Sequence, residues 1–274
     1  MNTERLMNLA LEMAGLDAIP GDSAIHHPGD GIERILFGID LKAPELAIAK
    51  DLGFDCAISH HPIGGSSTLR FHEVLERHID QMTCAGVPLD VAEATMRGTI
   101  EDRRVLSSMT NYDHDPSVAR LLGMPYLNIH TPLDEIGRRR MADAVAGLDE
   151  TKAIADLIEH LRRSFGEFQN VATEIEQRAG ISGNSIGKAV VSHGAGTNGG
   201  YPVAKAYFDH GIDTVIYIHC RPADAARLRD EYGEAKNLVV TGHSASDAVG
   251  INPYVDRLRE LGLDVTTFSG IIPA

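Results

Sequence analysis

Short apolar runs alternate with amphipathic segments along this sequence, and that alternation limits its fold more than any other feature. Apolar runs of strand length lie at 34–39, 55–59, 125–130, 188–193, 213–219, 237–242 and 264–270. Helical spacing, with proline near the start or glycine near the end, marks 43–53, 201–211, 222–233 and 252–262. For the last of these we expect Asn252 as the N-cap and Pro253 at the first helical position. Strands that alternate with helices in this way predict an α/β fold.

Two strand–helix–strand units look like copies of each other. Six identical residues recur 158 positions apart: Pro44 and Pro202, Asp51 and Asp209, Gly53 and Gly211, Asp55 and Asp213, Ile58 and Ile216, and His61 and His219. We therefore expect two similar α/β domains, each with a central sheet flanked by helices. The first half is placed at 1–165, with a helical insertion from about residue 70, and the second at 166–274, with 166–187 as the linker.

Charge and cysteine content exclude several classes of protein. Asp and Glu number 39 against 25 Lys and Arg, and the net charge of -14 repels phosphate backbones, so nucleic acid is not an expected partner. No apolar run approaches the roughly 18 residues of a membrane span. The three cysteines are scattered and odd in number, which indicates a reducing compartment such as the cytoplasm rather than a disulfide framework.

Two adjacent histidines follow the strand predicted at 55–59. His60 and His61 therefore stand at the carboxyl end of a strand, where active-site groups of α/β sheets gather. Pro62 keeps His61 extended, so the two imidazoles are expected on opposite sides of the loop, each suited to a different ion. Zinc, iron, nickel and copper accept such ligands. The alternative is a loop pair hydrogen-bonded to the backbone.

Further donors follow two other predicted strands. His130 ends one of them, and Asp134 just after it is either a metal ligand or the cap of the next helix. His243 and Asp247 are four residues apart, so a helical turn would place both on one face, and Pro253 is expected to end that helix early. Because each group follows a strand, the residues together predict a site for two ions with positions open for water.

Other histidines and a glycine-rich segment leave alternatives open. The segment 194–199 fits the pattern of a dinucleotide-binding loop, but no acid follows the next strand, and a tight glycine turn explains the pattern more simply. Arg221 could suit the 2′-phosphate of NADP in that reading. His193 and His219 end their strands, whereas His26 and His27 are read as part of a surface loop.

Four segments resemble the Nif-three-like dinuclear metal-centre family, also labelled GTP cyclohydrolase 1 type 2. They are DLGFDCAISHHPIG, NIHTPLDEIG, VVSHGAGTNGG and VVTGHSASDAVGINPYVDRL, and the similarity covers roughly 33–62, 125–147 and 187–270. The resemblance implies a homo-hexamer with two divalent ions per subunit, and mixed imidazole and carboxylate ligands fit zinc, iron, manganese or nickel. The ligands it implies are His60, His61, Asp134, His243 and Asp247. Asp247 stands where the family usually has a glutamate.

The function implied is that of a metal-dependent hydrolase. The ions would activate water, and His130, His219 or His193 would assist. The substrate would be a small molecule, either an anion such as a nucleotide or a phosphoester, or a cyclic amide. Two other functions stay open. One is a metal-bearing oligomeric scaffold without catalysis, and the other is the NADP-binding oxidoreductase that the glycine segment suggests.

Overall fold

The chain divides into two compact units in a computed structural model that describes residues 1–274. Unit 1 comprises Met1–Val74, Ile100–Ile136 and Gly250–Ile271, and unit 2 comprises Leu75–Thr99, Gly137–Val249 and Ile272–Ala274. Each unit is therefore assembled from separate stretches of the chain around one sheet of its own. None of the helices combines the length and the apolar character that crossing a membrane requires.

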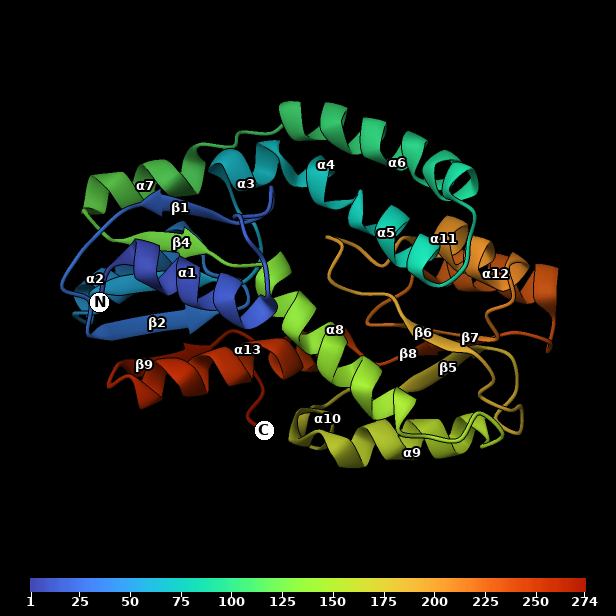
Figure 1. Ribbon diagram of the computed structural model, residues 1–274. Coiled ribbons are helices and arrows are strands. Elements are labelled where there is room, and N and C mark those ends of the chain that lie inside the picture. The colour runs from blue at the N-terminus through green and yellow to red at the C-terminus, as the bar shows by residue number, and fades with distance from the viewer. The chain divides into compact units, whose positions relative to one another are not determined.

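Unit 1 is built on a five-stranded sheet in the order β1-β4-β3-β2-β9 (Figure 1). Its strands are β1 (Ala24–His27), β2 (Arg34–Gly38), β3 (Cys56–Ser59), β4 (Tyr126–Asn128) and β9 (Asp264–Phe268). β1 is antiparallel to β4, and the other neighbours are parallel. The carboxyl ends of the four parallel strands consequently share one edge of the sheet, where β1 begins.

Alternating side chains of this sheet pack against two sets of helices. Ile35 and Phe37 of β2 join the core formed with α1 (Thr3–Ala14), the start of α8 (Thr131–Ala146) and the end of α13 (His243–Glu260). Leu36 points the other way, to the core formed with α2 (Ala43–Asp51) and α7 (His114–Leu122). The central strands are thus buried on both faces, as their continuous apolar runs indicate.

Unit 2 has a four-stranded sheet in the order β5-β8-β7-β6. Its strands are β5 (Glu176–Ala179), β6 (Ala189–Val191), β7 (Thr214–Tyr217) and β8 (Asn237–Val240). One face packs on α9 (Ile154–Ser164), α10 (Gly166–Asn170), the end of α8 and the start of α13. Helices α11 (Gly200–Asp209) and α12 (Pro222–Tyr232) cover the other face (Figure 1).

Four further helices complete the helical region of the first half. Three are short, α3 (Gly65–Leu69), α4 (Phe71–Val74) and α5 (Arg77–Cys84), and the fourth is the long α6 (Leu89–Ser108). Together with α7 they fill the chain between β3 and β4, where a helical insertion is predicted, and so confirm it.

The two sheets repeat one topology, which confirms the predicted duplication. In each, an antiparallel edge strand with a register shift precedes a β–α–β unit and a further parallel strand. Asp55 and Asp213 make equivalent hydrogen bonds in the two copies. A carboxylate oxygen of Asp55 accepts from the backbone N of Arg34 at 2.8 Å, and one of Asp213 accepts from that of Lys188 at 3.1 Å.

Two local predictions are wrong. The segment 166–187 is not a plain linker, because it holds α10 and the edge strand β5, which pairs with β8. The segment 252–262 does not begin a helix with Asn252 as its cap. It is the second part of α13, which runs from His243 to Glu260 with Pro253 inside.

Arg140 explains how a proline fits within α13. Pro253 has no N–H to donate to the carbonyl of Val249, four residues earlier, and such a loss normally breaks a helix. The Nη1 group of Arg140 donates to that carbonyl instead. The same guanidinium lies over the ring of Phe165, 5.3 Å from its centroid, and 3.9 Å from the buried Glu167. A side chain of α8 thus supplies the hydrogen bond that the proline removes.

Replacing Arg140 by methionine should therefore destabilise the protein. Because the substitution leaves the Val249 carbonyl without its donor, we expect the free energy of unfolding to fall by about 1–3 kcal/mol. Urea denaturation followed by circular dichroism measures this change. The matched control is Arg163→Met on α9, whose exposed ion pair with Glu159 is worth less than about 1 kcal/mol. Equal losses in the two variants would contradict the role given to Arg140.

Candidate metal centre

Three histidines converge at the carboxyl edge of the sheet of unit 1. His60 and His61 follow β3 directly, and His130 follows β4. The ring centroid of His60 lies 5.2 Å from that of His61 and 4.9 Å from that of His130. One nitrogen from each ring lies within 4.8 Å of the others. His60 and His61 therefore belong to one cluster, because the loop after β3 brings both rings close to His130.

Each of these rings is fixed through its Nδ1 atom. Nδ1 of His60 donates to the carbonyl of Ile129 at 3.0 Å. Nδ1 of His61 donates to Asp40 at 3.0 Å, and Nδ1 of His130 donates to Asp22 at 2.7 Å. Because all three acceptors are oxygens, Nδ1 carries a proton in each ring, and Nε2 is the nitrogen that could face a metal. This is the arrangement of metal-binding histidines, whose second nitrogen is held by a carbonyl or a carboxylate.

Asp134 brings a carboxylate to the same cluster from the first turn of α8. Its Oδ1 lies 3.1 Å from Nε2 of His60, and its Oδ2 lies 3.6 Å from Nε2 of His130. The Asp134 residue is only 3% exposed. Ligands about 2.0–2.2 Å from one ion at tetrahedral angles are roughly 3.3 Å apart, so these separations fit a shared cation. The donor set in unit 1 therefore suits a divalent ion such as zinc.

Asp22 and Asp40 hold two of these rings in place, and the sequence did not predict them. Asp22 is fully buried and accepts from His130 and from the hydroxyl of Thr131 at 2.6 Å. Asp40 follows β2, at the same edge of the sheet, and holds His61. No spacing links either aspartate to its histidine, because the partners are far apart in sequence. The only available signal is the position of Asp40, directly after a predicted strand.

Unit 2 repeats the pattern with fewer donors. His243 begins α13 and Asp247 lies one turn further along it, and Nε2 of His243 is 3.3 Å from a carboxylate oxygen of Asp247. The ring of His219, which follows β7, lies 4.7 Å from that of His243. Asp247 is 2% exposed, so its carboxylate needs cationic or polar partners. The spacing of four residues does bring this pair together, as the sequence predicts.

The remaining candidates lie in strands, in the core or in a tight turn, outside the cluster of donors in unit 1. His193 follows β6, is buried, and its carbonyl accepts from Gln81. His26 and His27 lie within β1 rather than in a surface loop, and His26 contacts Asn128 at 3.0 Å. Burial lowers the pKa of His26. The glycine segment between β6 and α11 is a tight turn, in which Gly194, Gly196 and Gly199 all adopt positive φ.

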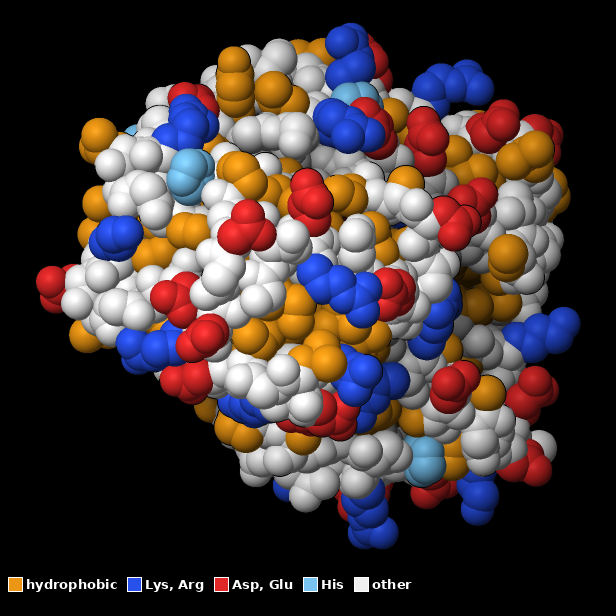
Figure 2. Space-filling model, turned by 60° about the vertical axis from the view of Figure 1, so that its left-hand side comes forward, with side chains coloured by type: hydrophobic (Ala, Val, Ile, Leu, Met, Phe, Trp, Pro, Cys, Tyr) orange, Lys and Arg blue, Asp and Glu red, His pale blue; other side chains and the backbone are white.

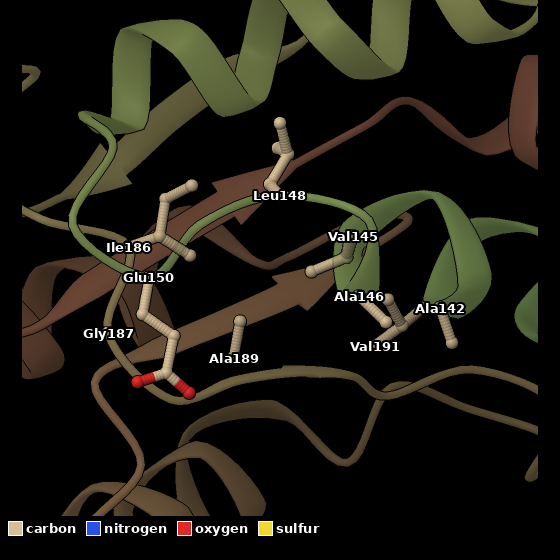
Figure 3. A pocket seen from close by; sticks show the side chains of 9 residues that line it. All are labelled: Ala142, Val145, Ala146, Leu148, Glu150, Ile186, Gly187, Ala189 and Val191. Atoms are coloured by element: carbon tan, nitrogen blue, oxygen red, sulfur yellow. The ribbon is translucent and has the colours of Figure 1, made fainter.

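A separate cavity of about 320 Å³ in unit 2 is not a second donor site. Its walls are mostly aliphatic, from the end of α8 and from β6, and Glu150 is its one charged side chain (Figure 3). Acidic and basic side chains are interspersed over the face drawn in Figure 2. Neither feature gathers histidines and carboxylates as the strand ends do.

Fold and donors together define a class: a duplicated α/β protein with histidine and carboxylate groups at the strand ends, suited to metal binding. The chain belongs to the NIF3 superfamily. It is 47% identical to the NIF3 superfamily protein from Sphaerobacter thermophilus, whose structure matches with a TM-score of 0.94 over 98% of both chains. The search against family models and the search of curated proteins gave no match.

More distant structures share the fold alone. HcgD from Methanocaldococcus jannaschii matches with a TM-score of 0.57 at 13% identity, over 97% of both chains. The Bacillus cereus protein related to NIF3 matches with a TM-score of 0.52 at 12% identity, over 98% of this chain and 96% of that one. The architecture is therefore kept while most side chains differ.

Proposed function

We propose that this chain is a hydrolase with a dinuclear centre of two divalent ions. The observation that carries the proposal is the set of three imidazoles in unit 1, each fixed through Nδ1 and each with one nitrogen within 4.8 Å of the others. His60, His61 and Asp134 would act as ligands, and His130 is added to them because it is anchored in the same way. Membership of the NIF3 superfamily supports the assignment.

His243 and Asp247 are proposed as the further ligands. Two ions need more donors than the four of unit 1, and this pair offers an imidazole and a buried carboxylate of the same kind. The metals are drawn from zinc, iron, manganese and nickel. By resemblance to the family, we further propose a cytoplasmic homo-hexamer.

The residues prepare the site for an anionic substrate. When bound, divalent ions act as Lewis acids and lower the pKa of water toward neutrality. Asp134 and Asp247 together neutralise only half of the charge of two divalent ions, so the site would attract anions. Asp22 and Asp40 keep the protons on Nδ1 and thereby fix the tautomer and the orientation of their histidines. Nucleotides, phosphoesters and cyclic amides remain the substrate classes.

Hydrolysis assays with chelation test the proposal. The purified protein, with its metal content measured, is offered bis(4-nitrophenyl) phosphate, nucleoside triphosphates and cyclic amides. We expect turnover of at least one class, its loss after dialysis against a chelator, and its return on adding back the divalent metal found in the protein. Stoichiometric metal without turnover of any class would contradict the hydrolase and favour the scaffold.

A further inference from the structure

A polar cavity in unit 2 lies next to His243 and contains arginines. It has a volume of about 350 Å³ and is formed by the turn before α11, the end of β7 and the start of α12. Thr197, Gly200, His219, Arg221 and Arg227 are among its lining residues. The glycine-rich segment that the sequence analysis singled out thus forms one wall, and the residues that follow β7 form another.

The two arginines make this cavity locally positive in an acidic protein. Neither guanidinium pairs with a carboxylate of the chain, and that of Arg227 stacks on the ring of Tyr201, 3.7 Å from its centroid. Asp224 is the one carboxylate in the lining. Two unpaired guanidinium groups in a chain of net charge -14 favour an anionic ligand with several oxygens, because each can donate two parallel hydrogen bonds.

Thr197 adds a hydroxyl donor on a fixed loop. Its Oγ1 accepts from the backbone N of Gly199 at 3.2 Å and contacts Nε2 of His78 at 3.1 Å. His78 is fully buried, and burial lowers its pKa to about 4, so the ring is neutral. Its Nδ1 has no partner, and a buried lone pair is tolerated better than a buried N–H. Nε2 therefore donates to Thr197, whose own proton is left for a ligand.

Helix α5 holds this loop in place from the outside. Besides His78, Arg77 donates to the carbonyl of Gly194 at 2.7 Å, and Gln81 donates to that of His193 at 2.7 Å. Gly199 and Gly200, at the start of α11, also line the cavity. The donors are thus set in position before any ligand arrives.

We propose that this cavity binds a phosphate group of the substrate, and the proposal rests on the proposed hydrolase function. His219 links the two sites, because it lines the cavity and its ring lies 4.7 Å from that of His243. In this proposal the phosphate held by Arg221, Arg227 and Thr197 is the anchoring group and not the group that reacts. It anchors a phosphorylated molecule, such as a nucleotide, whose other end extends toward His243.

Phosphate binding in two kinds of variant tests this assignment. Inorganic phosphate is titrated calorimetrically into the purified full-length protein, with Arg221→Met/Arg227→Met and His243→Ala as the variants. We expect the double arginine variant to bind at least about 30-fold more weakly, since it loses two charge-assisted contacts, and His243→Ala to bind within about threefold of the unchanged protein. Arg229→Met, on α12 but outside the cavity, is the matched control and should bind normally.

Three results would overturn the phosphate site, and each differs from a failure of the hydrolase proposal. Loss of phosphate binding in His243→Ala but not in the arginine variant would place the ion on the metals and overturn the proposal. Equal weakening in Arg229→Met, or no binding to the unchanged protein, would overturn it as well. None of these measurements depends on turnover, so an inactive protein that binds phosphate in the cavity would refute the hydrolase and leave the phosphate site standing.

Discussion

Replacing His60 by alanine is expected to remove metal from the protein. His60 is fully buried, and its Nε2 faces Asp134 at 3.1 Å, so the substitution takes away a proposed ligand from the centre of the cluster. Metal affinity should fall by more than the roughly 10–100-fold that the loss of an outer partner costs. With His243→Ala added, the stoichiometric content should disappear. Elemental analysis after extensive dialysis measures it.

The matched control is His114→Ala. His114 belongs to the same unit but is exposed and lies at the start of α7, away from the cluster. Its metal content should equal that of the unchanged protein. If the double variant of His60 and His243 also kept its full metal content, the assignment of these ligands would be wrong.

Replacing Asp22 by alanine is expected to impair stability and metal binding together. Its carboxylate is fully buried and accepts from both Nδ1 of His130 and the hydroxyl of Thr131. Alanine would leave these two donors without their acceptor, and it would also remove the longer contacts from Ser23 Oγ and the backbone N of Thr131. A buried donor without a partner costs about 1–3 kcal/mol, so we expect a loss near 3 kcal/mol. Freed of its anchor, His130 should also bind metal about 10–100-fold more weakly.

Thermal and urea unfolding, with metal titration, measure both effects. Asp17→Ala is the control, because Asp17 is exposed and outside the cluster. Asp22→Asn keeps the volume and separates packing from charge, and it should still bind metal more weakly. A drop in stability with unchanged metal affinity would show that Asp22 supports the fold alone.

Central elements of the fold could be predicted from sequence because they are buried on both faces. β2, β3, β7 and β8 are mainly apolar, and their runs predict strands within a residue or two of the observed bounds. β1 and β5 are edge strands with one partner each, so they need no apolar run. The sequence accordingly predicts a loop at β1 and a linker at β5. The helix through Pro253 depends on Arg140, a contact that local sequence does not encode. The boundary near residue 165 stays a prediction.

Donors of the candidate site were predictable where they follow strands. His60 and His61 after β3, and His243 and Asp247 after β8, stand at sheet edges that the pattern already indicates. Their binding of metal stays a prediction. The anchors could not be foreseen, because the contact of Asp22 with His130 joins segments more than a hundred residues apart. The same holds for Arg77 and His78, which support a loop far along the chain.

The pairing of β9 with β2 bears on how this protein is made. Residues 264–268 dock beside residues 34–38, and no strand in the second sheet corresponds to β9. During synthesis, one edge of the first sheet therefore stays open until residues 264–268 have left the ribosome. The stretch Gly137–Val249 of unit 2 emerges earlier and can begin to fold while the edge of β2 is still unpaired. A nascent chain halted before residue 264 would expose the bare edge of β2, which invites pairing with other chains.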